Sequence, residues 1–277
     1  RRGDRMKSMI FAAGLGTRLK PLTDTLPKAL VPVCGRPLIE YVLRKIMDAG
    51  ISGAVVNVHH FADKIEDWLE ARPWISVDGG LLQDPADSNG DGRMSVRISD
   101  ERNMLLETGG AVLHARQYLE GCGSFLVHNV DILSNCDIEW FAGQVRDDAV
   151  ATLLVSERKT RRYLLFEPDS MRLAGWTDVS AGEYRMVDGS ADPLKCRMLA
   201  FSGIHILSDR IFGIMEEYLR EKGIEQSEYG ARFPITDFYL SVASRHPVYG
   251  VLQNGLELLD VGKLDALGPA EEFVERQ

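Results

Sequence analysis

The chain has 277 residues, of which 45% are apolar and 26% are charged, and its formal net charge is -9. This length and composition predict one large α/β domain with a full hydrophobic core, which we place at residues 6–277, rather than two small domains. The acidic balance excludes a general nucleic-acid-binding or anionic-membrane surface, so a polyanionic ligand must meet a local cationic pocket. Composition leaves a homo-oligomer open.

The cysteines and the hydropathy of the chain indicate its compartment. Four cysteines are widely scattered without a C-x-x-C pair, which predicts free, buried thiols. No apolar run approaches the roughly 18 residues needed to span a bilayer, and no signal peptide is recognisable, so we expect a cytoplasmic protein without a membrane partner. Residues 1–5, before Met6, are expected to be an expression remnant or an upstream extension.

Apolar patterning in the first half of the chain alternates between short strand-like runs and helical spacing. The stretch from Pro37 to Ala49 illustrates the helical spacing, with proline suited to the first turn and Gly50 to the C-terminal cap. Such an alternation predicts a doubly wound, Rossmann-like, mostly parallel sheet. In chain order, we expect a strand at 9–13, a helix at 37–49, a strand at 54–58, a helix at 62–71, a strand at 94–98, a helix at 110–119 and a strand at 124–128.

The pattern loosens beyond residue 149. Strand-like runs at 151–155, 163–167 and 198–206 are separated by polar, glycine-rich segments instead of regular crossover helices. They predict a small sheet appended over the cleft of a single α/β domain. Helical patterns at 209–222, 236–243 and 266–275 complete the chain.

A glycine-rich loop directly follows the first expected strand. Gly14 and Gly16 let the backbone turn tightly, so that its N–H groups can cradle an anion. Arg18 adds a planar, permanently charged group for phosphate oxygens, and Lys28 supplies a second positive charge. Two cations and a nest of N–H groups predict a polyphosphate site.

Nucleotide-binding loops of other kinds do not fit this stretch. A dinucleotide-binding fingerprint requires a third glycine that opens a helix, whereas Leu19 occupies that position and Pro21 follows. A Walker loop requires G-K-[ST], which is absent. A nicotinamide oxidoreductase is therefore a weak alternative. A second alternative is that the stretch is only a tight turn, with two cationic side chains exposed to solvent.

The longer string A-A-G-L-G-T-R-L-K-P-L-T, followed by T-L-P-K-A-L-V-P-V, resembles the signature of the sugar-1-phosphate nucleotidyltransferases, also called nucleotide-sugar pyrophosphorylases. The resemblance covers most of the chain. It implies transfer of a nucleotidyl group from a nucleoside triphosphate to a sugar 1-phosphate. It assigns nucleotide binding to Ala13, Gly14, Gly16 and Thr17, and catalysis to Arg18 and Lys28.

Two aspartates are candidates for a Mg²⁺ site. Asp131 follows the string L-V-H-N-V, at the carboxyl end of a strand where ligands lie in parallel α/β sheets. The resemblance places the family's first metal-binding aspartate here, usually after a glycine, and Val130 departs from that pattern. Asp260, in L-L-D-V-G, resembles the family's strand-end D-x-G motif. Hard carboxylate oxygens suit Mg²⁺, with water and phosphate in the remaining positions.

The segment S-D-E-R-N-M-L-L-E-T-G-G-A resembles the family's base-recognition region. A glycine-rich turn there is expected to let the backbone approach the nucleobase, with Thr108 and Gly109 binding the nucleotide. Glu101 lies where relatives carry a base-reading polar residue, and a carboxylate accepts an N–H from uracil or guanine. Capping of the following helix is the ordinary structural explanation for Gly109 and Gly110.

Two other motifs do not predict a metal site. The run D-S-N-G-D-G at 87–92 starts like a calcium loop, but Ile98 occupies the twelfth position, where a bidentate glutamate is required. We expect a polar loop over the active site instead. The pair His59 and His60 has no second ligand pair at metal spacing, so it reads as loop or strand-end structure.

The sugar side of the site is less defined. The E-K-P string of relatives that make nucleotide hexoses is absent, and R-Y-L-L-F-E-P-D-S-M-R-L-A-G-W and F-S-G-I-H resemble the short N-acetylmuramate-1-phosphate uridylyltransferase and mannose-1-phosphate guanylyltransferase enzymes. UTP with an amino-sugar phosphate is favoured, with GTP and mannose 1-phosphate close behind. A catalytically silent nucleotide-sugar sensor is a further alternative. The resemblance places sugar-phosphate contacts at Asn129, Arg162, Glu167 and Lys195.

Overall fold

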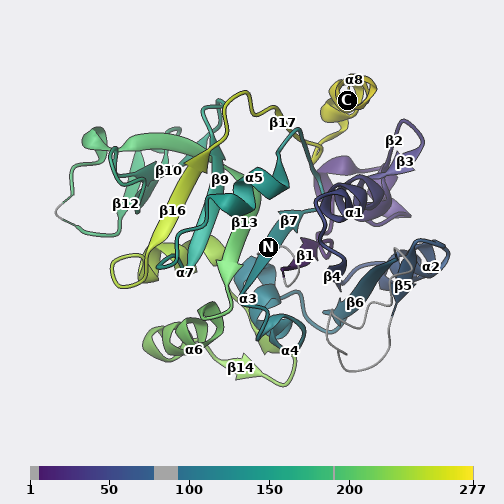
Figure 1. Cartoon of the computed structure of the whole chain (residues 1–277), viewed down its shortest axis with the longest axis horizontal. Helices are drawn as coiled ribbons and strands as arrows, with labels where there is room; N and C mark the ends of the chain where they lie inside the picture. Colours follow the sequence, from purple (N-terminus) through teal and green to yellow (C-terminus); the bar gives the residue numbers. More distant parts are fainter. Residues whose placement is uncertain (1–5, 78–92, 190, 277) are drawn as a thin grey trace.

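The structure, a computed structural model, describes residues 6–77, 93–189 and 191–276 (Figure 1). Five strands of the first half form a parallel sheet: β1 (Lys7–Phe11), β4 (Gly53–Val58), β5 (Ile75–Val77), β6 (Met94–Asp100) and β7 (Ser124–Asn129). β1 lies between β7 and β4, and β6 and β5 follow towards one edge. The strands of this parallel sheet therefore end on one side of the molecule, where a site is expected.

The second half of the chain extends this sheet. The long β13 (Arg197–Ser208) pairs with β7 in the antiparallel sense, with Ile204 opposite His128. β9 (Ala151–Ser156) joins β13, and β16 (Val248–Leu252) joins β9 in parallel. The central sheet is mixed and mostly parallel, which confirms the predicted Rossmann-like class.

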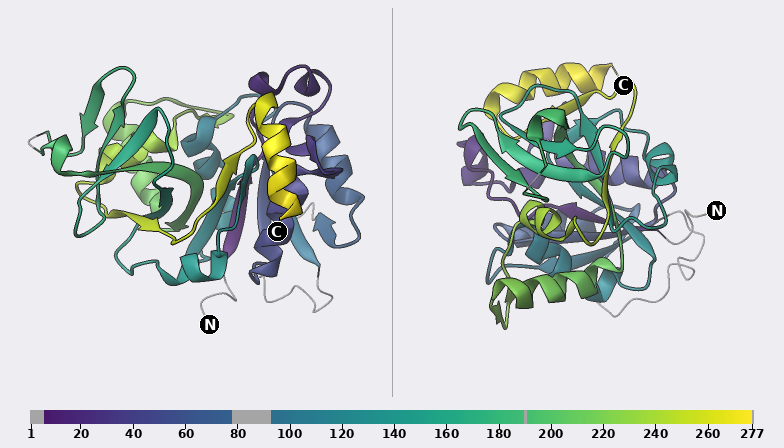
Figure 2. Two further views of the ribbon diagram at one scale, coloured as in Figure 1. Left: turned by 90° about the horizontal axis from the view of Figure 1, so that it is seen from above. Right: turned by 90° about the vertical axis from the view of Figure 1, so that its left-hand side faces the viewer.

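Helices cover both faces of the central sheet (Figures 1 and 2). Side chains on one face form a core around Val56 and Leu126, and those on the other face form a core around Phe125 and Val127. Neighbouring strand residues belong to different cores because their side chains point to opposite faces. The first face carries α1 (Leu38–Asp48), α2 (Ala62–Glu70) and α5 (Ile138–Gly143); the second carries α3 (Glu107–His114), α4 (Arg116–Leu119), α6 (Ile211–Lys222) and α7 (Ile235–Val242).

A small antiparallel sheet is appended to the central one, as the sequence predicts, but the run expected there at 151–155 forms β9 of the central sheet instead (Figure 1). It contains β10 (Arg162–Phe166), β11 (Leu173–Asp178) and β12 (Glu183–Met186). β13 links the two parts, because its first residues pair with β10 and its later ones with β7. The appended sheet is thus continuous with the central sheet through one strand.

Three two-stranded sheets and the last helix complete the fold of the described residues. β8 (Ile132–Ser134) pairs with β17 (Leu258–Asp260), β2 (Pro32–Val33) with β3 (Arg36–Pro37), and β14 (Gln226–Ser227) with β15 (Gly230–Ala231). The helix α8 (Leu267–Glu275) contributes Phe273 to a separate apolar cluster with Leu19 and Val31. Leu19 is fully buried there, so the end of the chain anchors the loop that follows β1.

The expected elements are present with ends that differ mostly by one or two residues, and two differences are informative. β1 ends at Phe11, before the expected strand end at residue 13, because the N–H groups of Ala12 and Ala13 turn to the Asn57 side chain. The helix expected at 110–119 begins earlier and is divided into α3 and α4. The polar loop at 87–92 lies outside the described residues.

The cysteines are free, but their burial differs from the expectation. Cys136 is buried, whereas Cys34 is exposed in the tight turn between β2 and β3, where its φ is 47°. The expected burial is therefore confirmed for Cys136 and wrong for Cys34, while Cys122 and Cys196 are half-buried. In the described ranges, no helix combines the length and the apolar character that crossing a membrane requires.

Candidate active site

The loop after β1 is held in a tight turn. Gly16 has a φ of 63°, and its carbonyl accepts a hydrogen bond from Thr23 Oγ1 at 2.7 Å. A Cβ on Gly16 would lie 2.8 Å from Thr23 Cγ2, so both the left-handed backbone and the close approach require glycine. The N–H groups of Gly14, Leu15 and Gly16 have no hydrogen-bond acceptor within the described parts of the chain. These groups are available for phosphate oxygens.

Ala13 differs from the other expected nucleotide-binding residues. It is buried, and its N–H donates to Asn57 Oδ1 at 3.3 Å. Thr17 and Arg18 are exposed in the short helix η2 (Thr17–Leu19), which begins directly after Gly16. The open side of the loop therefore begins at Gly14.

Lys28 connects the loop region to the end of β7. It opens the short helix η4 (Lys28–Leu30), and its Nζ forms a close ion pair with Asp131 Oδ2. Both side chains are largely buried, with exposed fractions of 13% and 12%. Water screens such a pair less than it screens an exposed one. Lys28, the predicted second positive charge of the phosphate site, is thus paired with Asp131, the predicted metal ligand.

The two candidate aspartates are brought together by the antiparallel pairing of β8 with β17. Asp260 is opposite Ile132 in that pairing, and the Val261 N–H donates to the Asp131 carbonyl at 2.8 Å. Gly262 marks where the side chains converge: a Cβ there would lie 2.6 Å from Asp260 Oδ1, 2.8 Å from Arg18 Nη2 and 3.4 Å from Asp131 Oδ2. Arg18, Asp131 and Asp260 thus lie around one point of the structure.

The chemistry of this donor set fits a hard divalent cation. Asp131 and Asp260 offer carboxylate oxygens around one point, and Asp260 Oδ1 also accepts the Gly262 N–H at 2.9 Å. Within the described residues, no group of three or more His, Cys, Asp or Glu side chains could hold a metal. Mg²⁺ held by two carboxylates would therefore take its other ligands from water and phosphate, as it commonly does.

The glycines of the predicted base-recognition turn have another use in the structure. Gly109 and Gly110 lie inside α3, where both N–H groups donate to the Phe233 carbonyl. A Cβ on Gly110 would lie 2.0 Å from the Ala231 carbonyl oxygen, and one on Gly109 would lie 2.4 Å from the Phe233 ring. The group that closely approaches these glycines is thus the segment of Ala231 and Phe233, whereas the sequence predicts a nucleobase. Neither caps the start of the helix.

Thr108 and Glu101 are also held by the protein itself. Thr108 Oγ1 accepts the Ile235 N–H at 2.9 Å. Glu101 is 3% exposed, and its two oxygens accept from Asn57 Nδ2 at 2.8 Å and from the Leu106 N–H at 3.1 Å. Burial raises the pKa of Glu101, and these two hydrogen bonds oppose the rise. Base reading by Glu101 stays a prediction, and it would have to add to these bonds or replace them.

The four expected sugar-phosphate contacts are not brought together. Asn129 ends β7 beside Gly203 of β13, where a Cβ would lie 2.5 Å from its Nδ2. Arg162 is the first residue of β10, and its Nε lies 3.6 Å from Asp178 Oδ2. Glu167 directly follows Phe166, and Lys195 lies two residues before Arg197, the partner of Phe166 in the sheet. This level is roughly 20 Å along β13 from that of Asn129, at 3.3 Å per residue. Only Asn129 therefore adjoins the aspartates in this structure.

Two residues at the site are missed by the sequence prediction. Asn57 is a polar residue within the apolar strand A-V-V-N-V, which is the signal that could have identified it. Gly262 is part of the D-V-G string, but its proximity to Arg18 and to both aspartates is visible only in three dimensions.

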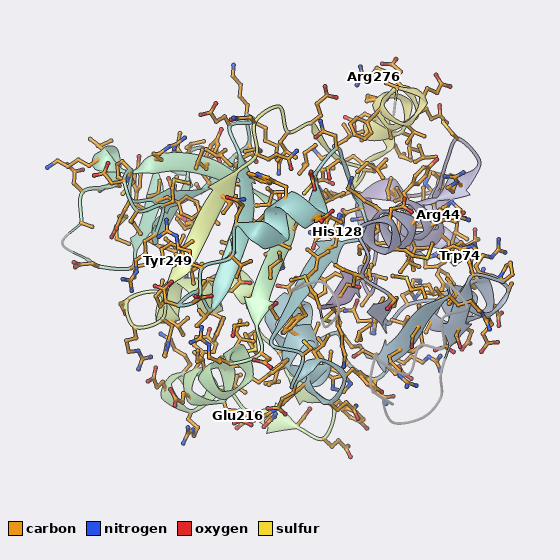
Figure 3. All side chains as sticks on the ribbon, viewed as in Figure 1. Arg44, Trp74, His128, Glu216, Tyr249 and Arg276 are labelled. Carbon is orange, nitrogen blue, oxygen red and sulfur yellow. The ribbon has the colours of Figure 1, made fainter. Side chains whose placement is uncertain are left out.

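Two cavities of about 620 Å³ each lie away from the loop of residues 14–16, called the glycine loop below. One is lined by α1, by the start of α5 and by Phe273 of α8, and its wall includes His128, seen between α5 and α1 in Figure 3. The other lies near Cys122 and Thr152. Neither cavity includes the converging residues Arg18, Asp131 and Asp260.

Comparison with other sequences finds uridylyltransferases among the similar proteins. N-acetylmuramate alpha-1-phosphate uridylyltransferase of Caulobacter vibrioides is 44% identical over 124 residues, which cover 45% of this chain and 45% of that protein. The protein of the same description from Neisseria meningitidis is 37% identical over 132 residues, covering 48% and 49%. The chain spans about half the length of the curated relatives it matches.

Solved structures share the fold over almost the whole chain. UDP-glucose pyrophosphorylase from Acinetobacter baumanii has a TM-score of 0.69 at 19% identity, covering 96% of this chain and 92% of that one. HddC from Yersinia pseudotuberculosis, complexed with GMP-PN, has a TM-score of 0.66 at 21% identity, covering 97% and 99%. The nucleotidyl transferase family model matches residues 7–277. The chain therefore belongs to the nucleotidyl transferase family.

Proposed function

We propose that this chain transfers a uridylyl group from UTP to a sugar 1-phosphate, giving a nucleotide sugar and pyrophosphate. The observation that carries the proposal is the convergence of Arg18, Asp131 and Asp260 on Gly262. It lies beside the loop of residues 14–16, whose N–H groups have no acceptor among the described residues. The family match and the two uridylyltransferase relatives support the reaction class and favour UTP.

The reaction is a direct displacement at the α-phosphorus. An oxygen of the sugar 1-phosphate forms a new bond to that phosphorus, the bond to the β-phosphate bridging oxygen breaks, and pyrophosphate leaves with the electron pair. No covalent intermediate with the protein is needed. Catalysis would then consist of positioning and of charge stabilisation.

Each charged residue has a task in this scheme. The N–H groups of Gly14 to Gly16 would hold the triphosphate, and Arg18 would stabilise the departing pyrophosphate. Lys28 would bridge phosphate oxygens once nucleotide competes with Asp131 for its ammonium group. Asp131 and Asp260 would hold Mg²⁺, which when bound neutralises negative charge on the phosphates.

The acceptor is proposed to be an N-acetylated amino-sugar 1-phosphate, with N-acetylmuramate 1-phosphate first because both uridylyltransferase relatives carry that description. A second candidate is transfer from GTP to mannose 1-phosphate. It is favoured by a mannose-1-phosphate guanyltransferase of Xenopus laevis, which is 27% identical over 61% of this chain and 43% of that protein.

The test is pyrophosphate release with Mg²⁺ from four nucleoside triphosphates, each combined with the 1-phosphates of glucose, mannose, N-acetylglucosamine and N-acetylmuramate. We expect one productive pair containing UTP, with activity lost on chelation and in Asp131→Ala. Asp67→Ala is the matched control, because Asp67 is an exposed aspartate of α2 away from the site.

Other outcomes separate the alternatives. Turnover with GTP and mannose 1-phosphate would replace the uridylyl proposal by the second candidate. Tight binding of a nucleotide sugar without Mg²⁺-dependent exchange of pyrophosphate into triphosphate would overturn the enzyme proposal in favour of a sensor. Activity that persists unchanged in Asp131→Ala would remove Asp131 from the mechanism.

A further inference from the structure

Asn57 lies where the chain leaves β1 and enters the glycine loop. It is opposite Phe11 in the pairing of β4 with β1, and it is 3% exposed. Its Oδ1 accepts two hydrogen bonds, from the Ala12 N–H at 2.7 Å and from the Ala13 N–H at 3.3 Å. One side-chain oxygen thus takes both N–H groups of the two residues that precede the loop.

Glu101 fixes the orientation of this amide. Glu101 Oε1 accepts from Asn57 Nδ2 at 2.8 Å, which leaves Asn57 Oδ1 facing the two alanine N–H groups. The second oxygen, Oε2, accepts the Leu106 N–H at 3.1 Å. Because both Glu101 oxygens face donors, the ionised carboxylate satisfies the arrangement. A flipped amide would set Oδ1 against that carboxylate.

The two sets of loop N–H groups are sharply divided. Those of Ala12 and Ala13 point inward to Asn57, whereas those of Gly14, Leu15 and Gly16 have no acceptor in the part of the chain that the structure describes. Ala12 and Ala13 are buried, so losing their acceptor would leave two buried donors unsatisfied. The backbone would then be expected to rotate towards another acceptor, taking the glycine loop with it.

We propose that Asn57 and Glu101 are positioning residues of the triphosphate site: they hold the N–H groups of Ala12 and Ala13 inward and thereby direct those of the glycine loop towards the nucleotide phosphates. The inference rests on the proposed function, because it assigns the loop to a nucleoside triphosphate. Neither residue touches the phosphates itself. Their effect passes through the backbone of residues 12–16.

The test compares Asn57→Ala with Ser8→Ala. Ser8 also belongs to β1 and its Oγ donates to the Gly53 carbonyl of β4 at 3.1 Å, so the control loses a side-chain hydrogen bond between the same two strands at the opposite end. Binding of inorganic tripolyphosphate is measured by calorimetry, alongside the KM for each substrate and the melting temperature. Tripolyphosphate is used because its binding does not depend on knowing the acceptor sugar.

We expect Asn57→Ala to bind tripolyphosphate about tenfold more weakly and to raise the KM for the nucleoside triphosphate by a similar factor. The KM for the sugar 1-phosphate should change less than about twofold. Ser8→Ala, which removes one hydrogen bond instead of three, should lower the melting temperature less and leave tripolyphosphate binding at the wild-type value. A purely structural role of Asn57 would make the two variants alike in binding.

Asn57→Asp provides a rescue that depends on a proton. It keeps an acceptor for Ala12 and Ala13 but sets a second carboxylate against Glu101, so one of the two must be protonated for the pair to form. His59 and His114 also lie close enough to act on Glu101. Tripolyphosphate binding by Asn57→Asp, divided by that of wild type, should recover as pH falls from 8 to 6.

Equal tripolyphosphate binding by wild type, Asn57→Ala and Ser8→Ala would overturn the inference and leave the proposed reaction untouched. The opposite failure is distinguishable. If no pair of substrates releases pyrophosphate, but wild type still binds tripolyphosphate more tightly than Asn57→Ala does, the transfer reaction fails and the positioning role stands. If Asn57→Ala does not fold, the pH dependence of Asn57→Asp decides the question.

Discussion

Gly262 is the residue on which the charged groups of the candidate site converge. A Cβ at this position would meet Asp260 Oδ1, Arg18 Nη2 and Asp131 Oδ2, all at the ends of side chains. Such ends can move aside, so the folded structure would tolerate a methyl group. The cost would instead fall on the relative placement of a cation and two carboxylates, on which catalysis by positioning depends.

We therefore predict that Gly262→Ala separates activity from stability. Its kcat should fall by about tenfold to a hundredfold, because a shift of about 1 Å in a positioned group can cost that much. Its melting temperature should stay within about 3 °C of wild type. Steady-state pyrophosphate release and thermal unfolding measure the two effects.

Gly213→Ala is the control for this prediction. Gly213 lies within α6, and a Cβ there would meet nothing within 4 Å. Alanine in a helix interior is favoured over glycine by up to about 1 kcal/mol, so this variant should be slightly more stable and fully active. Wild-type kcat in Gly262→Ala would show that the convergence of the three side chains has no catalytic importance.

At the scale of elements, α3 contacts the segment from Gly230 to Phe233. Here we expect an added methyl group to reduce stability, unlike at Gly262. At Gly110 the nearest atom to an added Cβ is a backbone oxygen, that of Ala231, at 2.0 Å. Backbone cannot move aside as a side-chain end can. Gly110→Ala should therefore push this segment off the helix and disturb packing in the core around Phe233.

We predict that Gly110→Ala lowers the free energy of unfolding by about 1–3 kcal/mol, the usual cost of overpacking. Urea denaturation at neutral pH measures it. Gly143→Ala, at the end of α5 in open space, is the matched control and should change stability by less than about 0.5 kcal/mol. Equal stability of the two variants would mean that the Ala231 carbonyl does not constrain α3.

The elements also show where sequence reasoning succeeds. The amphipathic pattern predicts α1 to within one residue at each end, and the apolar runs predict β4, β7 and β9, because burial of one face imposes a local period. The short strand β8 is not predicted, and a strand that ends at Asp260, which is β17, follows only from the motif resemblance. They exist because of their pairing with each other, which brings together residues distant in sequence.

The same distinction holds for the site. Asp131 and Asp260 are predicted from strand-end positions and from motif resemblance, and the structure places both beside Arg18. The use of Gly109 and Gly110 is not predictable in this way, because their neighbour, the segment of Ala231 and Phe233, lies more than a hundred positions later. Residues whose role is set by a distant segment need the fold to be known.

At the scale of the whole molecule, two buried histidines link stability to pH. His128 and His205 are each 1% exposed, and burial lowers the pKa of His128 to about 4 and that of His205 to about 3. His205 Nδ1 lies at hydrogen-bond distance from the buried Tyr239 hydroxyl. Since an unfolded histidine has a pKa near 6.5, the unfolded state binds more protons than the folded state below that pH.

The two histidines therefore make the folded chain less stable as pH falls. Each histidine stabilises the folded chain fully above pH 6.5, and its contribution is lost as pH falls towards the folded-state pKa. Between pH 7 and pH 5, we predict a loss of about 2 kcal/mol in the free energy of unfolding for each ring. Glu101, whose pKa burial raises, acts in the opposite direction over part of this range.

Comparing wild type with His205→Gln separates the contribution of His205 to the pH dependence of stability from that of Glu101, because both proteins contain Glu101. His205→Gln cannot titrate, so the difference between its unfolding free energy and that of wild type should shrink by about 2 kcal/mol from pH 7 to pH 5. Urea denaturation at pH 5, 6 and 7 measures it. His60→Gln is the control, because His60 is exposed after β4 and its replacement should leave the wild-type slope unchanged. Parallel profiles for wild type and His205→Gln would mean that His205 is not held neutral in the folded core, and that the packing of β13 against α7 admits a charge.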